Sequence, residues 1–262
     1  MKTQSAEEYL KSKRKYPTIV VDNFFENPDF IRKFALSLSY EKDPEGKWPG
    51  ERSKKLYSID QSLQDFMANK ILSIYFDMRY TQVTWEDSYL MFQKVERFSD
   101  IKDSLDNKGW IHVDDNQTFA GVVYLTPNIN PNSGTSIFRL KDEYSDFNIH
   151  DLDVTPKIER YRNDIFEKNK LLKLETDIKK TLDYMYKRFE LVTEVKNIYN
   201  RCVIFDSNQY HTANEYYTDG EERLTFVYFF KNVKSTVLPL EKIYEHDEDI
   251  KNRIKSYEDA IS

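Results

Sequence analysis

The stretch Trp110-Ile-His-Val-Asp-Asp115 contains a His-x-Asp pair, and the interpretation of the whole chain starts from it. In an extended strand, alternate side chains leave on the same face, so His112 and Asp114 would project side by side. An imidazole and a carboxylate placed in this way suit one metal ion. The spacing alone is a weak signal, because a His-x-Asp match arises readily by chance. The match indicates a metal site only if other segments of the chain place further metal-binding side chains next to His112 and Asp114.

Two downstream segments supply such groups. The apolar run from Arg201 to Phe205 is typical of a buried strand, and the polar turn after it leads to His211. Further on, Arg223-Leu-Thr225 opens a second apolar strand that continues to Phe230. Because Arg223 and Thr225 are two residues apart, a strand would present both side chains on one face.

These residue types fit one chemistry. Two imidazoles and one carboxylate on one face of an octahedral ferrous ion leave three positions open, enough for a bidentate 2-oxo acid and dioxygen. The far carboxylate of a dicarboxylate co-substrate must also be held, and a guanidinium matches a carboxylate bidentately. We therefore predict that His112, Asp114 and His211 hold a metal, and that Arg223 and Thr225 hold the co-substrate.

This set of residues resembles the iron and 2-oxoglutarate signature of the Fe(II)/2-oxoglutarate-dependent dioxygenases, in particular the prolyl 4-hydroxylase-like branch. Between the metal residues, Gly121-Val-Val-Tyr-Leu-Thr126 and Ser133-Gly-Thr-Ser-Ile-Phe138 resemble two strand motifs of that branch. The resemblance covers about residues 86–140 and 198–232. The chain departs from the pattern at Ser133, where a first glycine is common, and in a long insertion before the second metal histidine.

The resemblance implies Fe(II) as the metal, 2-oxoglutarate as the co-substrate and, as a further candidate, ascorbate. It also implies that Tyr124 contacts the co-substrate. The expected reaction consumes dioxygen and couples decarboxylation of 2-oxoglutarate to hydroxylation of a substrate. Because Asp114 fills the third protein position on the metal, hydroxylation is favoured over halogenation. The substrate is expected to be a peptidyl, prolyl-like residue or a small amino-acid-like molecule.

Short strands separated by turn signals favour an α+β fold with a double-stranded β-helix (jelly-roll) core. Covering helices are predicted near the N-terminus, one capped by Asn27 and the next by Asp60. Residues 40–55 carry the dipeptides of a loop, and their tail, Trp48 to Arg52, is either an ordered surface loop or a cover for the site. Strands are predicted at residues 16–22, 81–85, 88–95, 110–115, 119–125, 201–205 and 224–230. The strand at 88–95 is expected to neighbour the one bearing His112.

We predict a single domain spanning 1–262 with two helical additions. A charged segment at about 141–195 is expected to be a mainly helical insertion, with its front part at about 141–165 serving as a lid. The tail at about 241–262 has apolar residues on one side, typical of a helix docked on the domain or on a second subunit of a homodimer.

Composition excludes several other classes. The formal net charge of −6 over 262 residues provides no basic footprint for nucleic acid or an anionic membrane. The chain has no apolar run long enough to span a membrane, and its six glycines form neither a P-loop nor a dinucleotide fingerprint. Cys202 is the only cysteine, so we expect a reducing, cytoplasmic setting and a buried thiol.

Two rival functions remain open at this point. One is a non-catalytic jelly-roll module that binds a metal or serves as structure. The other is a cupin-type iron enzyme that does not use 2-oxoglutarate. Binding of 2-oxoglutarate through Arg223 separates both from the predicted dioxygenase.

Overall fold

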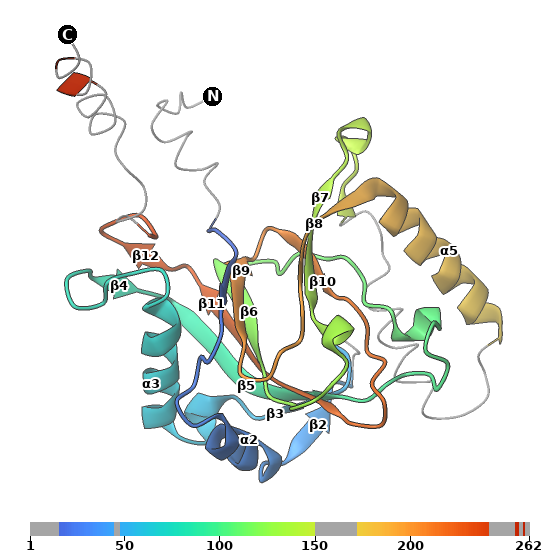
Figure 1. The fold of residues 1–262 in the computed structure, drawn as a ribbon, viewed down its shortest axis with the longest axis horizontal. Coiled ribbons are helices and arrows are strands. Elements are labelled where there is room, and N and C mark those ends of the chain that lie inside the picture. Colours follow the sequence, from blue (N-terminus) through green and yellow to red (C-terminus); the bar gives the residue numbers. More distant parts are fainter. Residues whose placement is uncertain (1–15, 45–47, 150–171, 241–254, 257–258, 260–262) are drawn as a thin grey trace.

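A computed structural model describes residues 16–44, 48–149, 172–240, 255–256 and 259 of the chain. In this part of the chain two antiparallel sheets face each other, with helices outside them (Figure 1). The helices are α2 (Pro28–Leu36), α3 (Gln61–Leu72) and α5 (Leu172–Arg188). The strands are β1 (Ile19–Val21), β2 (Tyr40–Lys42), β3 (Glu51–Ser53), β4 (Val83–Thr84), β5 (Asp87–Val95), β6 (Phe119–Tyr124), β7 (Thr135–Leu140), β8 (Phe189–Val195), β9 (Cys202–Asp206), β10 (Tyr210–Ala213), β11 (Arg223–Lys231) and β12 (Lys234–Ser235).

The major sheet has the strand order β1-β9-β6-β11-β5-β3-β2, and the minor sheet has the order β10-β7-β8. Residues from both sheets share one buried cluster, in which Val122, Tyr124 and Phe205 of the major sheet meet Ile137 and Val195 of the minor sheet. The sheets therefore pack face to face, as in a jelly roll. This confirms the predicted α+β fold with an antiparallel jelly-roll core.

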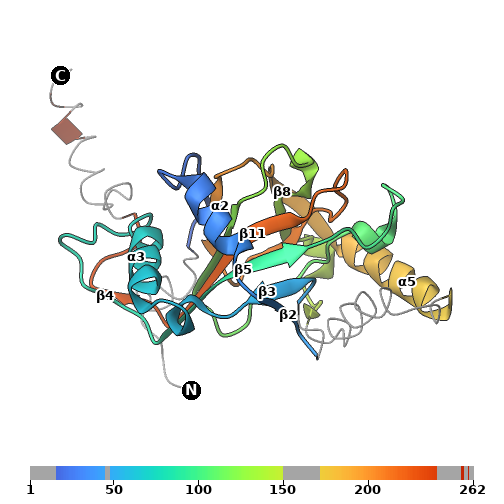
Figure 2. The same cartoon turned by 90° about the horizontal axis from the view of Figure 1, so that it is seen from below.

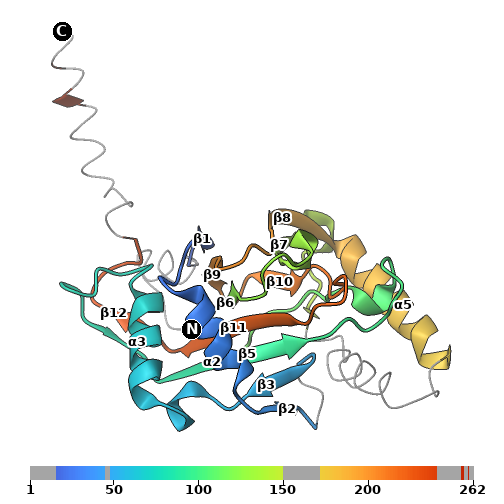
Figure 3. The same ribbon diagram turned by 60° about the horizontal axis from the view of Figure 1, so that its bottom comes forward.

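The opposite face of the major sheet is covered by α2 and α3, which lie on the same side of it (Figures 2 and 3). The largest buried cluster joins Met67 and Ile71 of α3 to Phe92 and Phe226 of the sheet. Alternate residues of β11 thus face two different cores: Phe226 faces the helices, and its neighbours on either side face the minor sheet. The helix α5 lies at the far end of the molecule from α3 (Figures 1 and 3).

The predicted helix starts are confirmed. The Asn27 side chain accepts a hydrogen bond from the Phe30 backbone N–H, and the Asp60 side chain accepts one from the Leu63 N–H. Helical spacing places Phe30 and Phe66 in the apolar stripes of these two helices, but Phe30 is 65% exposed and Phe66 is 60% exposed. Each lies at the margin of its helix's buried face, where helical spacing alone does not distinguish core from surface.

Three predictions about strands were wrong. Residues 110–115 form no strand and contain only an isolated bridge at His112. The strand β5 pairs with β11 and β3, not with the segment bearing His112. The expected loop at 40–55 contains the paired strands β2 and β3, which are too short to show an alternation in the sequence.

The helical insertion was predicted too long at its end. Residues 172–188 form α5, but residues 189–195 form β8, which pairs with β7 and completes the minor sheet. Of the expected lid at 141–165, residues 150–165 lie outside the described residues, and Asp142–Tyr144 form a short 3-10 turn. Residues 1–15 and most of the predicted C-terminal helix at 241–262 also lie outside them.

Candidate metal centre

His112, Asp114 and His211 converge between the two sheets. The Nε2 atom of His211 lies 3.2 Å from Asp114 Oδ2, and the Nε2 atom of His112 lies 3.9 Å from Asp114 Oδ1. The ligand atoms of the three residues all lie within 4.8 Å of one another. Neighbouring ligands of an octahedral ion with bonds of about 2.1 Å are about 3 Å apart, so small side-chain movements would place all three on one ion. The donor set fits Fe(II), for which two histidines and one carboxylate are a common arrangement.

Both imidazole rings are fixed in the orientation that metal binding needs. The Nδ1 of His112 lies 2.9 Å from the Trp110 carbonyl oxygen, and the Nδ1 of His211 lies 2.9 Å from the Gln209 carbonyl oxygen. A carbonyl only accepts, so each Nδ1 carries the proton and donates it. Each Nε2 is thereby directed at the centre, where it can bind a metal in its unprotonated form, as is usual for histidines that bind metals.

The charges at the centre favour one ion pair and one neutral ring. Burial, helped by the neighbouring His211, lowers the pKa of His112 to about 4. Burial opposes charge on His211 and Asp114 as well, but their mutual attraction and hydrogen bond outweigh it. The pKa of His211 is therefore raised and that of Asp114 lowered. A metal that binds His211 therefore competes with a proton that is held more tightly than usual, whereas the lowered pKa of His112 favours the neutral ring that binds metal.

The centre is open on one side. The side chain of His112 is 35% exposed and that of Asp114 is 19% exposed, whereas that of His211 is only 8% exposed. A substrate can therefore approach along the His112 side, and the far side is closed by packing of His211 against Phe205, with ring centroids 4.5 Å apart.

The segment bearing His112 and Asp114 is held directly against the segment bearing His211, although it is not a regular strand. The backbone N–H of His112 donates to the His211 carbonyl oxygen at 3.0 Å, and the reverse bond is 2.9 Å long. On one side of this pair, the Asp114 N–H donates to the Ser207 carbonyl oxygen. On the other side, the Tyr216 N–H donates to the Asn107 carbonyl oxygen. Backbone pairing thus sets the relative position of all three predicted metal residues.

This pairing requires a glycine at position 109. A Cβ atom there would lie 1.6 Å from the Ala213 carbonyl oxygen, a contact that the paired backbone has no room for. We expect Gly109→Ala to push the two segments apart, to destabilise the fold by about 2 kcal/mol or more and to weaken metal binding. Chemical denaturation and zinc titration measure the two effects.

Gly220→Ala is the matched control for Gly109→Ala. A Cβ atom at position 220 would have no neighbour within 4 Å, although the φ of +104° is unfavourable for alanine. The control should cost only about 1 kcal/mol of backbone strain and leave zinc affinity unchanged. Equal zinc affinities for the two variants would show that close approach at Gly109 does not set the site.

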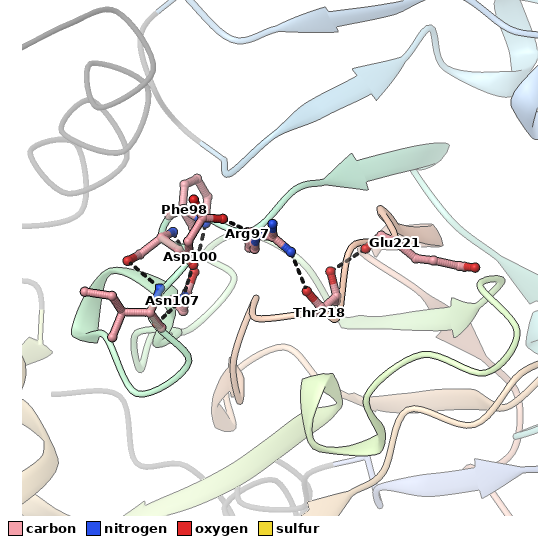
Figure 4. Close-up of polar contacts among 8 residues, drawn as sticks. Arg97, Phe98, Asp100, Asn107, Thr218 and Glu221 are labelled. Carbon is pink, nitrogen blue, oxygen red and sulfur yellow. Dashed lines mark hydrogen bonds and ion pairs between the residues drawn. The ribbon is translucent and has the colours of Figure 1, made fainter.

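The loop that leads into this segment is organised by Asn107, which is 1% exposed (Figure 4). The Asn107 side-chain oxygen accepts from the N–H groups of Phe98 and Ser99, and its amide donates to the Ser99 and Ile101 carbonyl oxygens. Next to it, Arg97 joins this loop to the Thr218 carbonyl oxygen at 3.1 Å. The loop before the segment that bears His112 and Asp114 is therefore fixed by a buried side-chain amide with four hydrogen bonds.

Asn107→Ala should cost about 3 kcal/mol in the free energy of unfolding, because it leaves buried backbone groups without partners. The Asp100→Ala variant is the control, since that carboxylate is 87% exposed and pairs with Arg97. It should change stability by less than about 1 kcal/mol. Urea denaturation of both proteins checks this, and similar losses in the two would contradict the role assigned to Asn107.

Arg223 lies deeper between the sheets, at the start of β11, and is 5% exposed. Its Nε donates to the Ser133 carbonyl oxygen at 3.0 Å, and its guanidinium carbon lies 5.6 Å from the centre of the Tyr124 ring. No acidic side chain of the described residues forms an ion pair with it. A buried guanidinium without an anion is costly, so this position suits the carboxylate of a bound molecule.

Tyr124 and Thr225 are close to Arg223 in the same sheet. Thr225 is the register partner of Tyr124, and both are completely buried. The Tyr124 hydroxyl donates to the Thr135 hydroxyl at 2.8 Å, whereas the Thr225 hydroxyl makes only a long contact of 3.4 Å with the Gln93 carbonyl oxygen. Tyr124 also packs in one cluster with Ile137, the register partner of His211. This cluster connects the Arg223 region to the three residues of the metal centre.

Ser133, at the departure from the glycine pattern, is completely buried and structural. Its hydroxyl donates to the Asn130 carbonyl oxygen and accepts from the Asn197 side chain. Its carbonyl oxygen is the one that Arg223 contacts. Ser133 therefore supplies Arg223 with a backbone partner, and its own side chain is used in hydrogen bonds to Asn130 and Asn197.

The sequence analysis considered Trp48 to Arg52 as a cover for the site but assigned no role to Arg52, whose charge acts on both His112 and Asp114. The missed signal was the turn Trp48-Pro-Gly50 between two short polar segments, which is also typical of a hairpin.

Residues 4–219 match a family model described as a family of unknown function, DUF6445. The chain belongs to this family. Membership of DUF6445 assigns no reaction, since the family is defined without a function. No curated protein matches the chain in sequence.

Among solved structures, this DUF6445 chain is similar to HygX from Streptomyces hygroscopicus, solved with nickel and 2-oxoglutarate bound. The identity is 11%, the TM-score is 0.47, and 88% of each chain is covered. A Pseudomonas putida prolyl-4-hydroxylase is 13% identical with a TM-score of 0.40, covering 82% of this chain and 91% of its own. A prolyl hydroxylase from Trichoplax adhaerens, solved with a peptide fragment of hypoxia inducible factor, is 10% identical with a TM-score of 0.44, covering 82% and 83%.

None of the helices in the described part of the DUF6445 chain combines the length and the apolar composition needed to cross a bilayer.

Proposed function

We propose that this protein is an Fe(II)- and 2-oxoglutarate-dependent dioxygenase that hydroxylates its substrate. The observation that carries the proposal is the pairing of two features between the sheets. One is a convergent set of two histidines and one aspartate, and the other is the buried Arg223 without an acidic partner in the described residues. A metal-binding module without a co-substrate would need only the first feature.

His112, Asp114 and His211 would hold the iron on one face and leave the remaining positions open. Iron, 2-oxoglutarate and dioxygen would together supply the oxidation: 2-oxoglutarate loses carbon dioxide and takes up one oxygen atom as succinate, and the substrate takes up the other as a hydroxyl group. Arg223 would bind the far carboxylate of 2-oxoglutarate, because its guanidinium is buried and its fork matches a carboxylate. Tyr124 and Thr225, on the same face of the sheet as Arg223, would contact the co-substrate and fix its orientation.

The exposed side of the centre, at His112, is where the substrate would approach. On the opposite side, the Phe205 ring packs against His211 and would limit access of water to the metal. Both Nδ1–H groups are held by backbone carbonyls, so the rings do not need to reorient during turnover. For the substrate, we propose a peptidyl, prolyl-like residue or a small amino-acid-like molecule. The completely buried Cys202 is consistent with a cytoplasmic setting.

Succinate formation tests the proposal. Protein loaded with Fe(II) in air and supplied with 2-oxoglutarate is expected to form succinate slowly when no substrate is present. Succinate formation should be faster when the substrate that the enzyme hydroxylates is added. Zinc-loaded protein is the control, because zinc has no redox chemistry and should form none. Absence of succinate across peptide and amino-acid substrates, together with absence of 2-oxoglutarate binding, would favour the metal-binding module or the cupin-type enzyme instead.

A further inference from the structure

The hairpin of β2 and β3 brings Arg52 to the inner face of the major sheet. In the register of the strands, Arg52 is opposite Gln93, Gln93 is opposite Thr225, and Thr225 is opposite Tyr124. Opposite residues in neighbouring strands point to the same face of a sheet. Arg52 therefore lies on the face that carries the predicted co-substrate residues and that faces the metal centre.

The turn before Arg52 is fastened to this face. The Gln93 side-chain amide donates to the Pro49 carbonyl oxygen at 2.7 Å. Gly50, with φ of +69°, lies against the β5 backbone, where a Cβ atom would come 2.1 Å from the Lys94 carbonyl oxygen. Trp48 is thereby held at the same site as Arg52, instead of extending into solvent as a free loop.

Arg52 sits among aromatic rings. Its guanidinium carbon lies 4.5 Å from the centre of the Trp48 ring and 5.7 Å from that of Phe229, which is also on the inner face. The Trp48 indole N–H is buried and has no hydrogen-bond partner among the described residues. The Arg52 guanidinium could bind an anion, and the Trp48 N–H could donate a further hydrogen bond to it. The Trp48 and Phe229 rings could pack against an apolar group attached to that anion.

This cation is close enough to affect the metal centre. The charge of Arg52 is among the causes that lower the pKa of both His112 and Asp114, and it is the one charged group outside the three metal residues that acts on both among the described residues. Arg52 is also separate from the co-substrate arginine. It lies on β3, two strands from the β11 strand of Arg223, which corresponds to about 10 Å across a sheet.

We propose that Arg52 and Trp48 form the substrate subsite of this protein, and that they select a substrate carrying a carboxylate. Arg52 binds the carboxylate, and the Trp48 N–H donates to the same group or to a neighbouring acceptor on the substrate. This inference rests on the proposed function, because it takes the metal centre as the place of reaction. The proposed substrates are therefore acidic molecules, including amino-acid-like molecules that bind through their carboxylate.

The test is a binding measurement on metal-free protein with phenylacetate and its neutral counterpart, phenylacetamide, followed by tryptophan fluorescence. The two probes have nearly the same shape and differ in charge. We expect wild-type protein to bind phenylacetate about 10-fold more tightly than phenylacetamide. The Arg52→Gln variant should lose that preference, and Trp48→Phe should lose most of the fluorescence change.

Two arginine variants serve as controls. Arg79→Gln, at a surface arginine paired with Asp77, should keep the preference. Arg223→Gln should also keep it, because the co-substrate arginine is not part of this subsite. A preference that survives Arg52→Gln, one that is lost in Arg223→Gln alone, or no binding of phenylacetate by wild-type protein would each overturn the proposal.

The same variants separate this inference from the proposed function. If Arg52→Gln weakens 2-oxoglutarate binding as much as Arg223→Gln does, Arg52 belongs to the co-substrate site and the substrate subsite is wrong, while the dioxygenase assignment stands. If 2-oxoglutarate does not bind at all but phenylacetate shows the expected preference, the anion subsite exists and the dioxygenase assignment fails.

Discussion

Asp114→Ala protein is expected to lose metal binding, with an affinity for Fe(II) or Zn(II) at least on the order of 100-fold below that of the wild type. The reason is that Asp114 is the one carboxylate of the three-residue centre and is close to both imidazoles. Substitutions that only support a metal ligand already cost about 10–100-fold in affinity, so loss of a ligand should cost more. Competition against a zinc-sensitive dye measures the change, and succinate formation should disappear with it.

Asp115→Ala is the matched control, because it removes a carboxylate from the next position along the chain. It should keep zinc affinity within about 3-fold of wild type, since Asp115 is not among the grouped ligand residues. If Asp114→Ala bound zinc as tightly as the control, the metal would have to lie elsewhere. Asp114→Ala also leaves His211 without its ion-pair partner, so the pKa of His211 in the metal-free variant should fall.

Arg223→Met is expected to have the second large effect, on co-substrate binding and not on metal binding. Removing a buried guanidinium that faces a carboxylate costs about 3 kcal/mol, which corresponds to about a 100-fold higher Kd for 2-oxoglutarate. Zinc affinity should stay near the wild-type value, because the contacts of Arg223 within the described part of the chain are to Ser133 and Tyr124 and not to the metal residues. Calorimetric titration of zinc-loaded protein with 2-oxoglutarate gives both quantities.

Arg79→Gln again provides a control, since it removes an exposed arginine and should leave the Kd for 2-oxoglutarate unchanged. Unaltered 2-oxoglutarate binding in Arg223→Met would mean that the co-substrate is held by another group or is not used. The cupin-type alternative would then gain support, because it needs the metal and does not need this arginine.

The sequence was most informative where a residue's local context decides its conformation. The helix starts at Asn27 and Asp60 follow from side chains that cap their own helices, and the long apolar strands β5, β9 and β11 show up as continuous patterns. His112, Asp114, His211 and Arg223 were predicted from chemistry and order along the chain. The structure brings the first three together and places Arg223 in a connected buried cluster.

What the sequence did not reveal depends on contacts between distant segments. The strand expected at 110–115 is instead an irregular segment held by backbone bonds to residues around His211, and no local pattern encodes such pairing. Gly109 has an ordinary place in the sequence, and its role appears only when Ala213 lies against it. Arg52 is similar, because it reaches the site through a hairpin whose strands are only three residues long.

The central claim is that His112, Asp114 and His211 hold one iron ion on which 2-oxoglutarate binds with its far carboxylate on Arg223. An anaerobic crystal structure with Fe(II) and 2-oxoglutarate tests this most directly. The expected result is one iron bonded to both histidine Nε2 atoms and to the Asp114 carboxylate at about 2.0–2.2 Å, with the co-substrate carboxylate against the Arg223 guanidinium. Iron bound at another set of residues, or 2-oxoglutarate away from Arg223, would contradict the account.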